Sequence, residues 1–518
     1  MNAPALLRVN DTSRLFAVVL SPIIIIAALS GGCGRHDATS DVLPDPAVPA
    51  DPPGERPITP PNFVVIITDD QPLGYMDALP FVNKYVFGRG VSFTNAFVTT
   101  SLCCPSRVSM LTGKYAHNHG VLSNAGRGGA DAFRNTGADA STLATWLASS
   151  GYRTAYVGKF LNQYPSELPG TSFYIPPGWN DWHAAIDVFP SDTPYAQVNY
   201  GMIENGVVTR YGSRDYDYFS DVVKRKSLDF VSRVLSTGEP FFLVMGFVSP
   251  HASAEYPRRH ERYFRHERAP RTAAFNELDI SDKPIWLSGV QPMDSDAIAN
   301  LDNLHRKMLR SLISVDEAVQ AVVQLVADRD ALKSTYFVFI SDNGLHLGEH
   351  RIAHDKNTPY EEAIRVPMAI LGPGLSNGVT RTEIVLNLDL APTILDLAGL
   401  QSADTVDGRS LVPLAIRNAS NGIPWRRRFL IEHFTPHLGE GDRPDARPNR
   451  LEYYAIRTDE HLYVEYAYGD FELYDLYRDR NQLENAFSNA PPELLGELRQ
   501  QLIALRACVG FQCRLAEE

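Results

Sequence analysis

Short runs of consecutive apolar residues recur along the chain from about position 61 and alternate with segments of helical spacing. The first run is 62–68 (NFVVIIT), and comparable runs occupy 152–157, 241–248, 336–340 and 368–371. Apolar runs of this length are typical of buried parallel strands. Apolar residues recur every three to four positions in 141–148 and 309–326, which predicts helices there. The alternation predicts an α/β domain over residues 61–414, with helices on both faces of its sheet.

The C-terminal part of the chain follows a different pattern. Apolar and polar residues alternate in 453–457 (YYAIR) and 461–466 (HLYVEY), as in antiparallel strands. A further strand is predicted at 471–475 and a helix at about 492–506. We therefore predict a small α+β subdomain with an antiparallel sheet over residues 415–518. We find no internal repeats.

The N-terminus has the pattern of an export signal. Residues 15–29 are apolar and uncharged and follow Arg8 and Arg14, and they are too few to span a bilayer but suit a signal-peptide core. Ser30, two glycines and Cys33 come next and resemble a bacterial lipobox. We predict a signal peptide over 1–33 and a Pro-rich linker over 34–60. Cys33 is either lipidated, which attaches the protein to a membrane of the bacterial periplasm or cell envelope, or incidental in an ordinary cleaved signal. Export machinery, and lipoprotein-processing machinery in the first case, are the expected partners.

Composition and charge restrict the classes of function. The 518 residues carry a formal net charge of −13, so the chain has no basic surplus for general nucleic-acid binding. A local basic pocket can still bind an anionic substrate within an acidic protein. The five cysteines are too few for a disulfide scaffold, so each needs its own explanation.

Chemically active residues follow several of the predicted strands directly. In open α/β sheets ligands bind at the carboxyl ends of the strands, so we expect these residues to meet at one edge. Their oxygen-bearing members suit Ca²⁺ or Mg²⁺ better than Zn²⁺, which prefers His and Cys; these members are Asp69, Asp70, Asp342 and Asn343. A candidate pocket for a tetrahedral oxyanion is formed by Lys114, Lys159, Lys356, Arg107 and His251.

A longer motif lies at 99–121, TTSLCCPSRVSMLTGKYAHNHGV. Its C-x-P-S-R core, followed by LTG, resembles the signature of type I sulfatases. The segments FVVIITDDQ, YVGKFLNQY, GFVSPHASAEYP and SDNGLHLGEHRIAHDKNTPYEEAIRVP are also similar to that family, over about residues 61–513. The chain is most similar to the branch of N-acetylglucosamine-6-sulfatases and extracellular heparan 6-sulfatases.

The resemblance implies a fold, a nucleophile and a metal. The fold is that of the alkaline phosphatase superfamily, with a large mixed β-sheet domain flanked by helices and a small C-terminal α+β domain. Cys103 would be converted to Cα-formylglycine by a formylglycine-generating enzyme and would attack a sulfate ester. The metal would be Ca²⁺ rather than Mg²⁺, held by Asp69, Asp70, Asp342, Asn343 and residue 103. The alternatives for Cys103 are a buried structural thiol or a disulfide with Cys104.

The resemblance also assigns roles to residues around the nucleophile. Arg107 would support residue 103, Lys159 and Lys356 would bind sulfate oxygens, and His251 would protonate the leaving oxygen together with Lys356. Many sulfatases carry a histidine two or three positions after the lysine that is Lys159 here, whereas this chain has Leu161 and Asn162. The base for sulfate elimination is therefore unassigned. Three histidines and a lysine are candidates for the base or for substrate binding, with a simply solvated side chain as the alternative: His117, His119, His346 and Lys114.

These inferences predict an exported enzyme that hydrolyses sulfate monoesters on a saccharide, with 6-O-sulfated N-acetylglucosamine as the preferred unit. A phosphonate or phosphodiester hydrolase of the same superfamily is one alternative. A non-catalytic glycan-binding lipoprotein is the other, if Cys103 stays unmodified. Cys508 and Cys513 are close enough in sequence to close a small disulfide in an oxidising compartment.

Overall fold

A computed structural model describes residues 43–49, 56–57, 59–165, 173–188, 193–416, 424–436 and 451–518. The predicted signal peptide, Cys33 and most of the predicted linker lie outside these ranges. Within them, no helix combines the length and the apolar character needed to cross a membrane.

The described residues form a ten-stranded sheet, and each strand predicted in the N-terminal part belongs to it. The strand β1 (Asn62–Asp69) lies between β9 (Thr335–Ser341) and β8 (Phe241–Pro250), and it runs parallel to both. Outward from β9, the sheet continues with β10 (Met368–Leu371), β2 (Val91–Phe93) and β11 (Val379–Arg381). Outward from β8, it continues with β4 (Arg153–Gly158), β5 (Asp181–Ala185), β6 (Tyr200–Glu204) and β7 (Val207–Tyr211). The predicted α/β sheet is confirmed.

The direction of the strands decides where the site lies. Strands β9, β1, β8, β4 and β5 are mutually parallel, whereas β10 and β6 pair antiparallel with their neighbours, so the sheet is mixed. The carboxyl ends of β9, β1, β8 and β4 therefore meet at one edge, as the sequence predicts.

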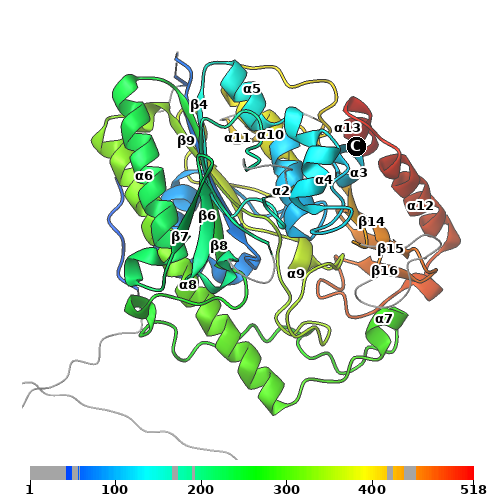
Figure 1. Cartoon of the computed structure of the whole chain (residues 1–518). Coiled ribbons are helices and arrows are strands. Elements are labelled where there is room, and N and C mark those ends of the chain that lie inside the picture. The colour runs from blue at the N-terminus through cyan, green and yellow to red at the C-terminus, as the bar shows by residue number, and fades with distance from the viewer. Residues whose placement is uncertain are drawn as a thin grey trace, which may run out of the picture. The chain divides into compact units, whose positions relative to one another are not determined.

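Helices cover both faces of this sheet (Figure 1). Alternate residues of β1 enter different apolar clusters, with Phe63, Val65 and Ile67 on one face and Val64 and Ile66 on the other. The first face packs against α2 (Cys103–Thr112), α5 (Leu143–Ser149) and α10 (Leu390–Leu397), and the second against α6 (Phe219–Thr237) and α8 (Ser295–Asp328). The helix predicted at 309–326 is the second half of α8.

The C-terminal part contains the predicted antiparallel sheet. Its strands follow one another as β13 (Arg428–His433), β14 (Tyr453–Thr458), β15 (His461–Tyr466) and β16 (Phe471–Asp475). Helices α12 (Pro492–Arg506) and α13 (Phe511–Ala516) pack beside it. One apolar cluster runs from β1 to Leu502 in α12, so the described residues form one compact unit, and the proposed boundary at 415 stays a prediction.

Shorter elements complete the described structure. Strands β3 (Ala96–Phe97) and β12 (Val385–Leu386) form a small parallel pair. The short helices are α1 (Pro80–Val82), α3 (Ala116–His119), α4 (Gly129–Asn135), α7 (Ile285–Ser288), α9 (Glu361–Ile364) and α11 (Val412–Ala415). Helix α3 directly follows α2, the helix that carries the C-x-P-S-R motif.

Candidate active site

Buried carboxylates converge where β1 and β9 end. Asp69 is the last residue of β1, and Asp70 follows it with a positive φ of 60°. Asp342 follows β9, and its Oδ1 accepts a hydrogen bond from the Asp70 backbone N–H at 3.2 Å. All three side chains are almost completely buried. The predicted convergence of strand ends is therefore present, and it concentrates negative charge in a small volume.

The C-x-P-S-R motif brings Cys103 to this cluster as the first residue of α2. Its Sγ lies 3.5 Å from Asp69 Oδ1 and 3.2 Å from Lys356 Nζ. Burial raises the pKa of the Cys103 thiol to about 12, against the opposing effect of two nearby lysines. An unmodified thiol is therefore neutral at physiological pH and a weak nucleophile.

Three cations balance the three carboxylates. Lys159 pairs with Asp69, and Lys356 pairs with Asp70. Arg107 lies on α2 one turn after Cys103, and its Nε donates to Asp342 Oδ2 at 2.7 Å. Each buried charge is therefore paired with an opposite charge, so the cluster is electrostatically balanced. An anion that enters the cluster can replace the carboxylates as the partner of the two lysine ammonium groups.

A glycine allows Lys159 to enter the cluster. Gly158 ends β4 with a φ of 116°, and a Cβ at this position would lie 1.9 Å from the carbonyl oxygen of Gly246 on β8. The backbone turns there without a side chain, and the Lys159 carbonyl then accepts a hydrogen bond from Arg107 Nη1 at 2.7 Å. The Gly-Lys sequence thus fixes both the lysine and the arginine.

The oxygen donors fit a hard divalent cation. Asn343 is fully buried, and its Nδ2 donates to Asp70 Oδ1 at 2.7 Å and to the Gly344 carbonyl at 2.8 Å. Its Oδ1 is buried without a hydrogen-bond partner among the described residues. Two overlapping groups of ligand atoms lie within metal-binding range of one another: Asp69, Cys103 and Asp342, and Asp69, Asp70 and His251. Carboxylate and amide oxygens in this number suit Ca²⁺ or Mg²⁺.

His251 follows β8 and faces the cluster. Its Nε2 lies 3.5 Å from Asp70 Oδ2, and its Nδ1 contacts the carbonyl oxygen of Ala252. The side chain is about one quarter exposed, in contrast to the carboxylates beneath it. His251 therefore lies on the open side of the cluster, where a leaving group would depart.

Tyr195 is a site residue that sequence reasoning missed. Its ring centroid lies 4.6 Å from that of His251, and Lys159 Nζ lies 5.0 Å from the ring centroid. Its hydroxyl donates to Asp187 Oδ2 at 3.0 Å and accepts from Asn162 Nδ2 at 2.8 Å. Tyr195 lies between β5 and β6 in a stretch without a motif, so only its aromatic character marked it.

Three of the four remaining candidates lie near the end of α2, away from the nucleophile. Both ring nitrogens of His117 are engaged, Nδ1 with the Glu432 carboxylate at 3.0 Å and Nε2 with the Cys508 carbonyl at 3.1 Å. His119 contacts Ser109 Oγ at 3.1 Å, and burial lowers its pKa to about 3. Lys114 is partly exposed in the turn between α2 and α3. No hydrogen bond or ion pair within the described ranges joins these three residues to Cys103 or to the acidic cluster.

His346 supports the loop that carries Lys356. It is fully buried, and its Nε2 contacts Thr358 Oγ1 at 2.7 Å. The ring of Tyr360, just beyond this loop, packs against His346, and its hydroxyl donates to Glu472 Oε1 on β16 at 2.6 Å. The C-terminal sheet thereby fixes a loop that supplies a lysine to the active site.

The remaining cysteines are also accounted for. Cys103 and Cys104 are separate buried thiols, so the alternative of a disulfide between them is not seen. Cys104 Sγ accepts a hydrogen bond from the Asn162 backbone N–H at 3.0 Å. Cys508 and Cys513 form the predicted disulfide.

Comparisons with known proteins show the family of the chain. The sulfatase family model matches residues 61–400, and the model described as N-sulphoglucosamine sulphohydrolase, C-terminal, matches residues 348–508. The chain is 34% identical to human N-acetylglucosamine-6-sulfatase over 484 residues, which is 88% of this chain and 86% of that protein. It is 35% identical to the extracellular sulfatase SULF-1 homolog of Drosophila melanogaster over 72% of this chain, but it spans only 33% of that longer protein.

Among solved structures, the chain is similar in fold to BT4656 in complex with its substrate D-glucosamine-2-N,6-O-disulfate. The TM-score is 0.69 at 22% sequence identity, over 86% of this chain and 97% of that chain.

Proposed function

The chain belongs to the sulfatase family of sulfuric ester hydrolases, and from this premise we propose that it removes sulfate from a saccharide with residue 103 as the nucleophile. The observation that carries the proposal is the position of Cys103, which touches both Asp69 and Lys356 in a buried, charge-balanced cluster. Because the buried thiol is a weak nucleophile, its conversion to Cα-formylglycine by a formylglycine-generating enzyme is the chemistry that this position suits.

Two further groups complete the proposed active site, a formylglycine at position 103 and a divalent cation. A hydrated formylglycine supplies two geminal hydroxyl groups, so that ester hydrolysis divides into two displacements. A divalent cation, when bound, polarises a sulfate oxygen, and we propose Ca²⁺ rather than Mg²⁺ for this role. Its ligands would be Asp69, Asp70, Asp342, Asn343 and residue 103.

The chain's own residues bind the anion and move a proton. Lys159 and Lys356 exchange their carboxylate partners for sulfate oxygens and stabilise the charge that develops during transfer. Arg107 holds Asp342 and the Lys159 backbone in place. Because Nδ1–H of His251 donates to a backbone carbonyl, Nε2 faces the cluster, and the protonated ring gives its Nε2 proton to the leaving alcohol oxygen and becomes neutral.

No base for sulfate elimination is proposed, because among the described residues no hydrogen bond or ion pair joins His117, His119 or His346 to residue 103 or to the acidic cluster. Glu432 and the Cys508 carbonyl already engage both ring nitrogens of His117, and His119 is buried against α2. These contacts favour positioning roles for both histidines. His346 is fully buried, burial lowers its pKa well below the usual value, and its Nε2 contact to Thr358 favours a role in supporting the Lys356 loop.

We propose 6-O-sulfated N-acetylglucosamine, alone or within a polymer, as the substrate unit. The supporting observations are the 34% identity to a human N-acetylglucosamine-6-sulfatase and the similar fold of a protein bound to D-glucosamine-2-N,6-O-disulfate. We also propose export through residues 15–29, in agreement with the description of one relative as extracellular. The comparisons give no support to lipidation at Cys33 or to a bacterial periplasm, which stay predictions of the sequence.

Two measurements test the function. Mass spectrometry of the peptide that spans residue 103 should show a mass about 18 Da below that of the thiol form, since an aldehyde replaces a thiol. A panel of sulfated saccharides should release sulfate with the native protein and not with Cys103→Ala. A peptide that is entirely thiol in the native host, together with no sulfate release, would leave a glycan-binding protein. Faster turnover of phosphonate esters than of sulfate esters would favour the phosphonate hydrolase.

A further inference from the structure

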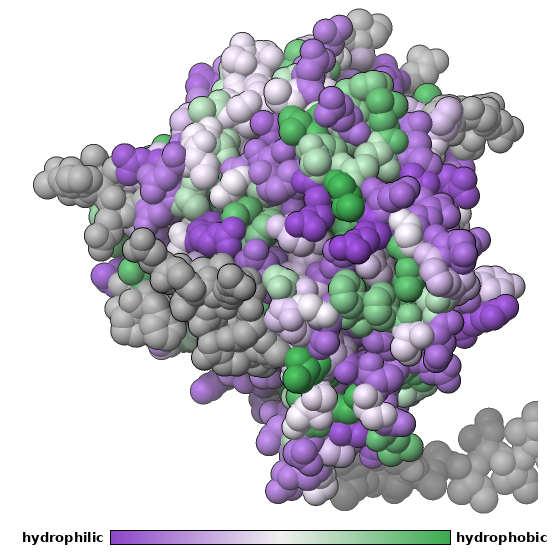
Figure 2. Space-filling view, turned by 90° about the vertical axis from the view of Figure 1, so that its right-hand side faces the viewer, coloured by the Kyte–Doolittle hydropathy of each residue, from purple (hydrophilic) through white to green (hydrophobic). Residues whose placement is uncertain are grey.

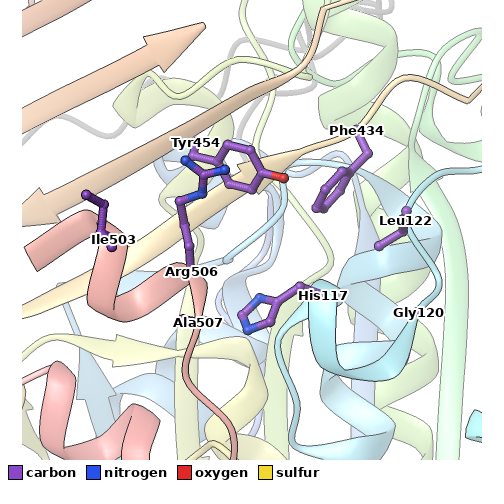
Figure 3. A pocket seen from close by; sticks show the side chains of 8 residues that line it. All are labelled: His117, Gly120, Leu122, Phe434, Tyr454, Ile503, Arg506 and Ala507. Atoms are coloured by element: carbon purple, nitrogen blue, oxygen red, sulfur yellow. The ribbon is translucent and has the colours of Figure 1, made fainter. Parts of the chain in front are cut away.

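A pocket of about 430 Å³ opens between α3, the C-terminal sheet and α12 (Figure 3). Helices α12 and α13 lie on the side of the molecule that Figure 2 turns toward the viewer, where hydrophobic and hydrophilic side chains are mixed. None of the metal-ligand candidates lines this pocket. The side chains that matter for its chemistry are His117, Leu122, Phe434, Tyr454, Ile503 and Arg506.

Two aromatic rings and Arg506 line the pocket, and a second arginine, Arg127, lies against one of the rings. The guanidinium carbon of Arg506 lies 3.7 Å from the ring centroid of Tyr454, and that of Arg127 lies 5.4 Å from the ring centroid of Phe434. A stacked guanidinium is held in one plane and keeps its N–H edge available for a planar or tetrahedral anion. The pocket therefore combines apolar surface with an oriented cation.

The charged side chains around the pocket include one more cation than anions. Arg127 Nη1 lies 3.2 Å from Glu452 Oε2, and His117 Nδ1 lies 3.0 Å from Glu432 Oε2. No carboxylate within the described ranges forms an ion pair with Arg506. A pocket with two neutralised pairs and one additional guanidinium attracts an anionic ligand.

The pocket is joined to the helix of the nucleophile. His119, two residues from His117 on α3, contacts Ser109 Oγ on α2 at 3.1 Å. Asn124, two residues beyond the lining residue Leu122, accepts a hydrogen bond from the Cys104 backbone N–H at 2.9 Å. Since α2 rises by about 1.5 Å per residue, Ser109 lies about 9 Å along the axis from Cys103. The segment that contributes His117 and Leu122 to the pocket thus also contacts the helix that begins with residue 103.

We propose that this pocket binds an acidic sugar unit, sulfated or carboxylated, of a polymeric substrate whose cleaved ester lies at residue 103. Arg506 binds the anionic group, and the rings of Phe434 and Tyr454 pack against the apolar face of the sugar. The inference rests on the proposed function, because it assigns to the protein a substrate of several sugar units. It adds that affinity grows with chain length.

The kinetic test uses Arg506→Ala with 6-O-sulfated glucosamine–uronate oligosaccharides from mono- to octasaccharide. For this variant the ratio of the octasaccharide KM to the monosaccharide KM should rise roughly 10-fold, as expected for the loss of one charge-assisted contact. The matched control is Arg499→Ala on the same helix, where Arg499 is largely exposed and pairs with Glu465 at 3.4 Å. An unchanged ratio in Arg506→Ala, or an equal change in the control, overturns the proposal.

A binding experiment separates this proposal from the proposed function. Calorimetry with the Cys103→Ala protein measures octasaccharide binding without turnover, and adding Arg506→Ala should weaken it by the same roughly 10-fold. Ile503→Glu, at a side chain that is 55% exposed, places a negative charge at the rim and should weaken it as well, which covers the case that Arg506→Ala fails to fold. Carboxyl-reduced octasaccharide shows whether uronate or sulfate is bound. If the wild type releases no sulfate but these binding losses occur, the enzymatic function fails and the pocket stands; unchanged binding in both variants refutes the pocket.

Discussion

Replacing Asn343 by leucine tests whether the acidic cluster binds a divalent cation. The substitution keeps the branched shape of the side chain and removes Oδ1, which is buried without a partner within the described structure. It also removes the Nδ2 hydrogen bond to Asp70 Oδ1. Loss of the hydrogen bond lowers the free energy of unfolding and removal of a buried unsatisfied acceptor raises it, by about 1–3 kcal/mol each. Without a cation, the variant should therefore be nearly as stable as the wild type.

The expected magnitude follows from binding linkage. A ligand that binds only the native state at a concentration of 100 Kd stabilises it by about 2.7 kcal/mol. If loss of one ligand weakens binding about 100-fold, the same concentration equals the new Kd and stabilises by about 0.4 kcal/mol. With an unfolding entropy of about 2.1 cal/mol/K per residue, the calcium-dependent rise in Tm falls from about 2.5 °C to about 0.4 °C.

The assay is thermal unfolding of EDTA-treated protein titrated with CaCl₂ and, separately, with MgCl₂. Asn118→Leu is the control, since it removes a comparable amide that donates to Asp407 at 2.9 Å outside the cluster and should keep the wild-type shift. A full calcium-dependent shift in Asn343→Leu would show that Oδ1 is not a ligand. A wild-type protein that responds to neither cation would refute the cation site itself.

Three further predictions concern other parts of the structure. Although burial opposes it, Glu432 raises the pKa of His117 to about 9, so this pair stabilises the fold fully below about pH 6.5 and ceases to do so as pH rises through about 9. In urea denaturation, the free energy of unfolding of the wild type should fall by up to about 3 kcal/mol over that pH range, and His117→Gln should abolish this fall. If the variant keeps the pH dependence of the wild type, the pairing is contradicted. Tyr195→Ala should lower kcat roughly 10-fold because the catalytic histidine loses its packing surface, whereas Tyr195→Phe should retain most activity; equal losses would assign the effect to the hydroxyl. Replacing Cys508 and Cys513 by serine should lower the free energy of unfolding by about 2 kcal/mol, and equal stability of the two forms in oxidising buffer would exclude a stabilising disulfide.

Much of the fold could be predicted because parallel strands buried on both faces leave continuous apolar runs. The run at 62–68 became β1 with one residue added, and the run at 368–371 became β10 without change. Strand β13 was not predicted, because its apolar run covers only the three residues 429–431. Helix α8 extends well before the predicted segment, since its first half carries more polar residues.

Some residues of the candidate site could be predicted from the sequence and others could not. Asp69, Asp342 and Lys159 follow buried strands, so the sequence alone indicated that they meet. The partners of His117 could not be predicted, because they come from β13 and from the disulfide loop. Tyr195 was missed for the same reason, since its contacts to His251 and Lys159 cross between separate strand ends.

The sequence by itself determined the parallel core, the C-x-P-S-R motif and the oxygen donors placed after strands, because local periodicity and fixed spacing encode these features. Only the tertiary structure decided which side chains share the cluster and which serve the packing. That decision depends on burial and on partners contributed by distant segments: a histidine beside the motif is engaged by a strand more than three hundred residues away. The pocket beside α12, with Arg506 stacked on Tyr454, likewise exists only after that helix has packed on the C-terminal sheet.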